Sequence, residues 1–374
     1  MNARYRVADI LQLEQSQLTS LSFTSWHLRT LHAIRRCRTS EMGGHIDKCD
    51  CCDQLHISYN SCRNRHCPSC QGHKREEWIQ SRKHELLNVP YFHVVFTIPD
   101  LLNPYCLQFP KEMYAAMFKA AWSTLCLFGK NELSVKPGMI AILHTWGQNL
   151  SLHPHLHCIV PGGGVTKSGH WKHSKTQGKF LFPVKAMSKV WRAKYIAELR
   201  KSKIPLSQSA IDETFNTPWV VYAKRPFGKP EHIVEYLGRY SHKIAISNHR
   251  ILNIDPIRRE VKFKLKNYRK NGKATTMTLS TKEFIRRFQL HILPKGFTRI
   301  RHYGILSSSW KKVKLPALQL ELAGRKKPKI PQNKAIVIHR RCPVCKKGKL
   351  ITIATFDSRG PPNSVMFLIK KRNG

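Results

Sequence analysis

The segment His153–Gly164, HPHLHCIVPGGG, determines the fold prediction for this chain of 374 residues. Its pattern indicates a strand, in which neighbouring side chains point to opposite faces. His155 and His157 then share one face, about 7 Å apart along the strand, while Leu156 enters the core. Two imidazoles placed in this way can share a metal ion, and histidine with oxygen ligands suits Mn²⁺ or Mg²⁺ as well as zinc. A single histidine is more often a hydrogen-bonded core residue, but three alternating histidines in five residues favour a metal site.

A stretch without charge surrounds these histidines. Residues 137–166 contain no Asp, Glu, Lys or Arg, although 23% of the whole chain is charged. Its polar residues and prolines are not typical of a membrane span. We predict a strand over Met139–Thr145, a loop, a second strand over Leu156–Val160 and then a glycine turn. A polar but uncharged stretch of this kind is typical of the centre of a buried active site.

The segments around this centre predict a mixed fold of helices and strands. Tyr91–Ile98 is a β-branched and aromatic run that ends at a proline, as expected of a buried strand. Lys111–Phe128 repeats apolar residues at steps of three and four, which predicts an amphipathic helix. Val261–Lys266 alternates strictly between apolar residues and lysine, which predicts a half-buried strand.

The net charge narrows the class of partner. The chain carries 65 Lys+Arg against 22 Asp+Glu, a formal net charge of +43. A compact protein with this charge repels itself unless a polyanion neutralises it, so nucleic acid is the expected partner and an anionic membrane surface is the alternative. With 41% hydrophobic residues, the chain is not disordered as a whole. It shows neither a secretory signal nor a run of 18 apolar residues, so we expect a soluble intracellular protein.

Twelve cysteines predict metal binding rather than disulfides, because the chain is long and shows no secretory signal. Two C-x-x-C turns, Cys49–Cys52 and Cys67–Cys70, are separated by fourteen residues. We predict that these four thiolates, Cys49, Cys52, Cys67 and Cys70, hold one structural zinc ion. Four unrelated buried thiols are the alternative.

Other residues in the same window allow a second tetrahedral site. Its predicted ligands are Cys37, His45, Cys62 and His66; otherwise these side chains pack in the core or contact nucleic acid. Near the end of the chain, Cys342-x-x-Cys345 has no partner pair in its neighbourhood. We therefore do not expect a complete zinc site in that region.

Two basic segments are candidates for phosphate contacts. The short loop between the two C-x-x-C turns carries Arg63 and Arg65, which can grip phosphates. The open face of the strand predicted over Val261–Lys266 can follow the backbone of single-stranded DNA. It carries three lysines, Lys262, Lys264 and Lys266. The alternative for each segment is a solvated cationic surface.

Two tyrosines one helical turn apart form a second candidate centre. Glu231–His242 is amphipathic and begins directly after a proline, which predicts a helix. Tyr236 and Tyr240 then project from one face of it. Aromatic core packing is the alternative. The adjacent cations Arg239 and Lys243, which we predict to bind DNA, favour a functional pair.

These motifs together resemble the rolling-circle insertion-sequence transposases of family ninety-one. His155-Leu156-His157 matches the histidine–hydrophobic–histidine motif of the HUH endonucleases, and Tyr236-x-x-x-Tyr240 matches their two-tyrosine version. The similar stretches follow in order within residues 25–310: Tyr59–Gln71 (YNSCRNRHCPSCQ), Tyr91–Pro99 (YFHVVFTIP), His153–Gly164, Tyr236–Asn248 (YLGRYSHKIAISN) and Glu283–Gly304 (EFIRRFQLHILPKGFTRIRHYG).

The resemblance implies an α+β fold, with an HUH-type antiparallel sheet flanked by helices and preceded by a small Cys-rich zinc-binding domain. It implies a zinc-binding domain with a connector helix at residues 1–88, a catalytic domain at 89–310 and a basic tail at 311–374. The implied activity is that of a DNA transposase that cuts and rejoins single strands through a covalent 5′-phosphotyrosine. Its partners would be transposon ends and target DNA, at least partly single-stranded, at the nucleoid in the bacterial cytoplasm.

The resemblance also implies roles for individual residues. Tyr236 and Tyr240 would attack the DNA, while His155 and His157 would hold the Mg²⁺ or Mn²⁺ ion that polarises the scissile phosphate. Sites of this family use a third ligand. We predict Gln148 for that place, with His144 as a close rival.

Two other classes of function remain open from the sequence. One is a zinc-containing DNA-binding regulator without chemistry, in which the histidines and tyrosines are structural. The other is a metal-dependent nuclease that hydrolyses DNA with water.

Overall fold

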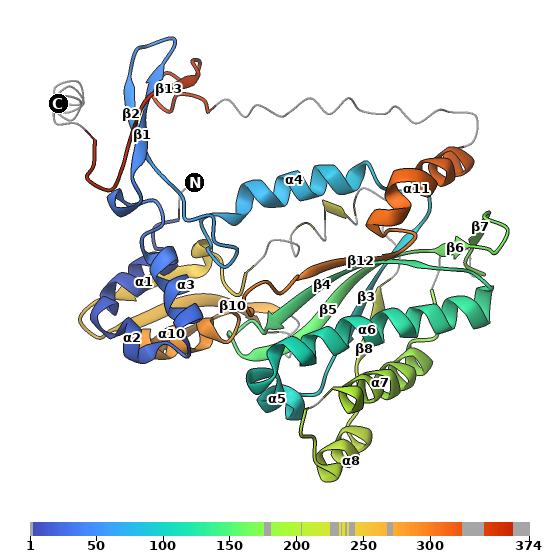
Figure 1. Cartoon of the computed structure of the whole chain (residues 1–374). Helices are drawn as coiled ribbons and strands as arrows, with labels where there is room; N and C mark the ends of the chain where they lie inside the picture. Colours follow the sequence, from blue (N-terminus) through green and yellow to red (C-terminus); the bar gives the residue numbers. More distant parts are fainter. Residues whose placement is uncertain are drawn as a thin grey trace.

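Helices and antiparallel sheets are mixed throughout the chain, which confirms the α+β prediction (Figure 1). The computed structural model describes residues 3–175, 181–202, 204–224, 232, 234, 235, 238, 244–267, 272–323 and 340–361.

A five-stranded sheet forms the centre of the molecule, in the order β12-β4-β5-β3-β8. Every neighbouring pair is antiparallel. Apolar residues of period two put one face of this sheet into the core, because side chains alternate along a strand. The strands are β3 (Tyr91–Thr97), β4 (Gly138–Trp146), β5 (Leu152–Pro161), β8 (Val221–Lys224) and β12 (Ile300–Gly304).

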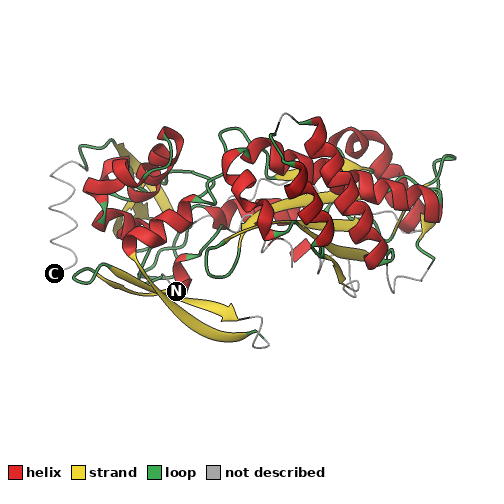
Figure 2. Cartoon of the chain, turned by 90° about the horizontal axis from the view of Figure 1, so that it is seen from below, coloured by secondary structure: helices red, strands yellow, loops and turns green. Residues whose placement is uncertain are grey.

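Four helices cover one face of this sheet, below it in Figure 1 and in front of it in Figure 2. The largest apolar cluster lies between them and the sheet, and Phe96, Met117 and Leu156 are fully buried in it. The longest of these helices begins at Pro110, a favoured first residue because a helix leaves that N–H unbonded in any case. The helices are α5 (Asn103–Gln108), α6 (Pro110–Phe128), α7 (Val184–Lys201) and α8 (Gln208–Asn216).

The opposite face of the sheet is partly covered by α4 (Gln71–Lys83) and α11 (Ser308–Ala323). Ile79 of α4 and Leu315 of α11 belong to a cluster with Tyr91, Ile140 and Ile159 on this face. In the sequence, β5 is followed by a small sheet of two strands, β6 (Gly163–Val165) and β7 (Trp171–His173).

The N-terminal helices share a core with a segment more than 200 residues away. Buried residues of α1 and α3 lie in one cluster with Phe263, Phe284 and their neighbours. One polar link between the two parts is Glu14, a buried carboxylate that pairs with Arg259 at 3.1 Å. The elements are α1 (Val7–Leu13), α2 (Leu18–Leu21), α3 (Ser25–Arg35), β9 (Ile251–Asp255), β10 (Glu260–Asn267), β11 (Lys273–Ser280) and α10 (Thr281–Gln289).

Another sheet joins segments near the two ends of the chain in the order β13-β1-β2. Strand β1 (Gly44–Cys49) pairs with β2 (Leu55–Tyr59) on one side and with β13 (Leu350–Phe356) on the other. The segment for which we predicted a basic tail therefore contributes both α11 and a strand of this sheet. Among the described residues, no helix is long and apolar enough to cross a membrane.

Replacement of Leu156 by Ala tests the assignment of the two faces of β5. Leu156 is fully buried between the sheet and the helices, so the cavity should lower the free energy of unfolding by about 2–5 kcal/mol. Lys264→Ala, at an exposed position in β10, should change it by less than about 0.5 kcal/mol. Chemical unfolding monitored by tryptophan fluorescence measures both. A loss below about 1 kcal/mol for Leu156→Ala would contradict the burial of this side chain.

Candidate metal centre and cysteine clusters

Three histidines meet on the face of the central sheet opposite α6. His155 and His157 alternate with Leu156 along β5, as predicted. His144 of β4 stands directly opposite His155 in the antiparallel register. One ligand nitrogen from each of the three rings lies within 4.8 Å of the others. This is the spacing of side chains that can bind one metal ion.

His155 is held in the form that a metal requires. Its Nδ1 lies 2.6 Å from the carbonyl oxygen of His153, which can only accept, so Nδ1–H donates and Nε2 keeps its lone pair. Burial lowers the pKa of His155 to about 4. The ring is therefore neutral near pH 7, as a metal ligand must be.

His157 is oriented by a residue that the sequence analysis did not single out. His93 of β3 places its Nε2 at 2.8 Å from Nδ1 of His157, and the two rings stack with centroids 5.0 Å apart. Both side chains are buried. Metal binding through Nε2 of His157 requires that its Nδ1–H donate to His93, the arrangement usual for metal-bound histidine. In the sequence, His93 could have been identified because it is a histidine within the apolar run that forms β3.

His144 is supported by aromatic packing. Its ring stacks on Trp146 of the same strand, with centroids 4.4 Å apart and 21° between the planes. The guanidinium carbon of Arg299 lies 5.8 Å from the Trp146 ring. Burial lowers the pKa of Arg299 to about 10, which leaves it charged near pH 7.

The third ligand was predicted as Gln148 with His144 as its rival, and the structure brings His144 next to the pair. Gln148 follows β4, and its carbonyl oxygen accepts a hydrogen bond from Arg250. A ligand role for its side chain stays a prediction.

The tyrosine pair lies outside the described residues, together with Arg239 and Lys243. The described neighbours Val234, Glu235 and Gly238 are helical. Val234 is buried in the cluster that contains Ile140 and Ile159. Glu235 pairs with Lys83 of α4 at 2.6 Å.

Val234 therefore belongs to the apolar cluster on the face of the sheet that carries the histidines, and Glu235 contacts α4. Ile159 is two residues beyond His157 on β5 and therefore on the same face. Gly238 lies so close to Ile79 of α4 that any larger side chain would overlap it. Val234 and Gly238, described residues on either side of position 236, thus lie beside Ile79 of α4 or in the cluster that contains it.

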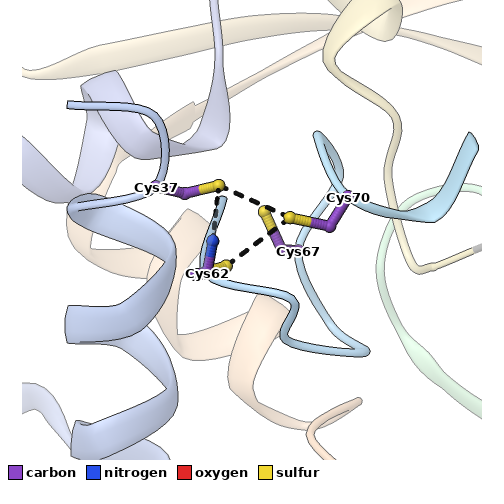
Figure 3. Close-up of side chains that lie close together, drawn as sticks. All are labelled: Cys37, Cys62, Cys67 and Cys70. Carbon is purple, nitrogen blue, oxygen red and sulfur yellow. Dashed lines mark hydrogen bonds between the residues drawn. The ribbon is translucent and has the colours of Figure 1, made fainter. Parts of the chain in front are cut away.

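Four cysteines form a compact cluster at the base of the β1–β2 hairpin: Cys37, Cys62, Cys67 and Cys70 (Figure 3). The Sγ atoms of Cys37 and Cys62 lie 3.5 Å and 3.7 Å from that of Cys70. Tetrahedral zinc with Zn–S bonds of about 2.3 Å separates its sulfurs by about 3.8 Å. The four residues fit one zinc ion.

The structure corrects both predicted ligand sets. Cys49 and Cys52 lie at the turn of the β1–β2 hairpin, whereas Cys67 and Cys70 follow its other end, so the hairpin separates the two C-x-x-C turns. The first pair clusters instead with Cys342 and Cys345. The prediction that these C-terminal cysteines lack a partner pair is therefore wrong.

The two histidines of the predicted second site have other partners. His45 lies 2.7 Å from the Arg340 guanidinium and 3.5 Å from Asp47. His66 is buried and accepts from Arg65 at 3.2 Å. Cys37 and Cys62, which we predicted beside them, complete the cluster of Figure 3 instead.

The predicted DNA-binding side chains fall into two groups. Arg65 donates to the carbonyl oxygens of Pro294 and Phe297, which gives it a structural role, and its burial lowers its pKa. The strand alternation predicted for β10 is confirmed, because Val261 and Phe263 are buried. The remaining described cations are exposed: Arg63, Lys262, Lys264 and Lys266.

Comparison with known proteins identifies the family. Residues 10–98 match the family described as a transposase zinc-binding domain, and residues 138–314 match one described as a putative transposase. The chain is 39% identical to a putative transposase of Sinorhizobium fredii, over 95% of this chain and 97% of that protein. The chain belongs to the transposases of insertion-sequence family ninety-one.

A second relative of this transposase supports the assignment. The chain is 27% identical to the transposase for insertion sequence element IS801 of Pseudomonas savastanoi pv. phaseolicola, over 75% of this chain and 70% of that protein. No solved structure matches the chain. The zinc-binding match contains all four cysteines of Figure 3, and the other match contains His144, His155 and His157.

His291 lies beside the cluster of His144, His155 and His157. It makes the stability of the transposase depend on pH. Burial lowers its pKa to about 4, against about 6.5 in an unfolded chain. The unfolded state therefore binds more protons between these values, and the free energy of unfolding should fall as the pH falls from about 6.5 towards 4. His291→Gln keeps a donor for the Leu150 carbonyl, to which Nε2 lies at 3.1 Å.

The comparison uses chemical unfolding of both proteins at pH 7 and pH 5. We expect the loss of stability on acidification to be smaller in His291→Gln by about 2 kcal/mol. Because zinc release affects both proteins equally, it cancels in this difference. The same loss in both would show that His291 is not buried in its neutral form.

Proposed function

We propose that this transposase cuts and rejoins single-stranded DNA, in rolling-circle-type transposition, through a covalent 5′-phosphotyrosine. The observation that carries the proposal is the cluster of His144, His155 and His157 on one sheet face. Its support is the burial of Val234, two residues before Tyr236, against that same face. Strand transfer by a tyrosine requires a metal centre and a nucleophile close to each other.

The three histidines would hold a divalent cation. Such an ion, when bound, polarises the scissile phosphate and stabilises the charge that develops on it. Imidazole ligands suit Mn²⁺ better than Mg²⁺, which prefers oxygen ligands and retains its waters. We therefore favour Mn²⁺ of the two predicted ions. His93 and the His153 carbonyl would fix the ring orientations of His157 and His155.

The tyrosines would perform the covalent step. The hydroxyl oxygen of Tyr236 or Tyr240 would attack the phosphorus, and the bond from phosphorus to the 3′ oxygen would break. The proton of the tyrosine would end on that oxygen, leaving a free 3′-OH and a 5′-phosphate on the protein. The phosphotyrosine conserves the energy of the broken bond, so a second transfer needs no ATP. The other tyrosine, one helical turn away, would accept the second strand end.

The remaining residues would bind and position DNA. Exposed lysines on β10 would track the backbone of a single strand, together with Arg63. Arg239 and Lys243 flank the tyrosines in the sequence and would contact the phosphates nearest the reaction. A structural zinc ion at the cluster of Figure 3 would hold the loop that carries Arg63. The substrate, transposon ends and target DNA, would place this activity at the bacterial nucleoid.

A denaturation-resistant adduct distinguishes this proposal from a nuclease that uses water and from a regulator without chemistry. The transposase is incubated with end-labelled single-stranded DNA of its transposon ends and Mn²⁺, then run on a denaturing gel. We expect a covalent band with the wild-type protein and none with Tyr236→Phe/Tyr240→Phe.

The matched control is Tyr222→Phe. Tyr222 is an exposed tyrosine of β8 that stands opposite Val95, itself opposite His157, and so lies on the histidine face. Its replacement should leave the adduct unchanged. Cleavage without an adduct in the wild type, or an adduct in the double variant, would overturn the proposal.

A further inference from the structure

Two C-x-x-C turns from opposite ends of the chain meet at the edge of the sheet that joins those ends. Cys49 and Cys52 close β1, and Cys342 and Cys345 precede β13. Cys52 and Cys342 are separated by 290 residues in the sequence, yet their Sγ atoms lie 3.7 Å apart. The Sγ atoms of Cys49 and Cys345 are also 3.7 Å apart. All four sulfurs lie within 4.8 Å of one another.

These distances are those of a tetrahedral zinc site and not of disulfides. Sulfurs around zinc are about 3.8 Å apart, whereas a disulfide joins them at about 2.05 Å. Two backbone N–H groups also point at the sulfurs. Cys51 donates to Cys49 Sγ at 3.4 Å, and Gly348 donates to Cys345 Sγ at 3.3 Å. Such donors stabilise thiolates, the form in which cysteine binds zinc.

The surrounding structure is built to bring the two turns together. Strands β1 and β13 pair in antiparallel register from Gly44 with Phe356 to Cys49 with Leu350. Asp47, a buried carboxylate of β1, pairs with Arg340 at 2.8 Å and accepts from Thr352 at 2.7 Å. Residues that precede and follow the C-terminal turn are therefore both attached to the N-terminal strand.

The C-terminal turn is in contact with the N-terminal one at a position that only glycine allows. A side chain at Gly348 would overlap the Sγ atom of Cys49 and the Cβ atom of Cys51. His56 of β2 also lies near the four sulfurs, with its Nε2 at 3.7 Å from Cys342 Sγ. The N-terminal turn and the C-terminal turn thus pack against each other around the four sulfurs.

We propose that Cys49, Cys52, Cys342 and Cys345 bind a second structural zinc ion, which fastens residues 340–361 to the N-terminal hairpin. The zinc-binding family match ends at residue 98, so two of these four ligands lie outside it. This site is separate from the histidine centre and from the cluster of Figure 3. The zinc-binding part of the transposase is complete only when both ends of the chain are present.

Metal analysis of the full-length protein tests the proposal. The wild type should contain two tightly held zinc ions per chain, and Cys342→Ser/Cys345→Ser should contain one. Cys51→Ser is the matched control, because Cys51 lies between the ligands and is absent from the cluster; it should keep two. Cys345→His, which preserves a zinc ligand, should also keep two.

Cobalt substitution gives a second measurement, and its wild-type value does not depend on how any variant folds. Two tetrahedral four-thiolate sites per chain should double the thiolate-to-cobalt absorption expected of one. Cys37→Ser/Cys70→Ser should halve the signal but leave the site at Cys342 and Cys345 occupied. A single such site in the wild type, two zinc ions in Cys342→Ser/Cys345→Ser, or a mass showing disulfides at these cysteines would overturn the proposal.

Discussion

The alternation of side chains along β5 is the constraint on which the site depends. It sends Leu156 and Cys158 into the core under α6 and leaves His155 and His157 on the opposite face. A shift of one residue would exchange the two sets and would bury two imidazoles in the apolar cluster. The register with β4 then determines the partner, because His144 stands opposite His155. The three histidines therefore lie on strands of the central sheet and not on loops.

The strands that carry the three histidines contain no charged residue, whereas the surface of the protein is cationic. The uncharged residues 137–166 form β4, β5 and β6, and the ring of His155 is neutral because burial lowers its pKa. Lysines lie instead on exposed faces of strands such as β10. The long-range field of the protein would then bring a polyanion towards the histidines. The net charge of +43 therefore comes from residues outside the uncharged stretch that carries the histidines.

Local pattern made the central elements predictable. Strands expected over Met139–Thr145 and Leu156–Val160 are β4 and β5, each somewhat longer than predicted, and the helix expected over Lys111–Phe128 is α6. These segments can be recognised from their own residues, because β4 is a continuous buried apolar run and α6 repeats apolar residues at helical spacing. His144 was a weaker prediction than Gln148, because the spacing along one strand does not reveal what the next strand places opposite it.

The cysteine pairing could not be predicted for a related reason. A C-x-x-C turn brings two thiolates together but does not specify the second pair. The β1–β2 hairpin separates Cys52 from Cys67, and strand pairing with β13 brings in Cys342. Such contacts arise from packing between segments about 290 residues apart. The N-terminal helices likewise pack against residues far away in the sequence, beyond residue 244, which complete their core.

Pulsed electron paramagnetic resonance of Mn²⁺ bound to the full chain tests the histidine centre most directly. A site made by His144, His155 and His157 predicts couplings from three imidazole nitrogens, reduced to two in His144→Gln. His153→Gln, which keeps the backbone carbonyl that orients His155, and Gln148→Ala should both retain three. Absence of nitrogen coupling in the wild type, or three couplings in His144→Gln, would contradict a metal centre on this face of the sheet.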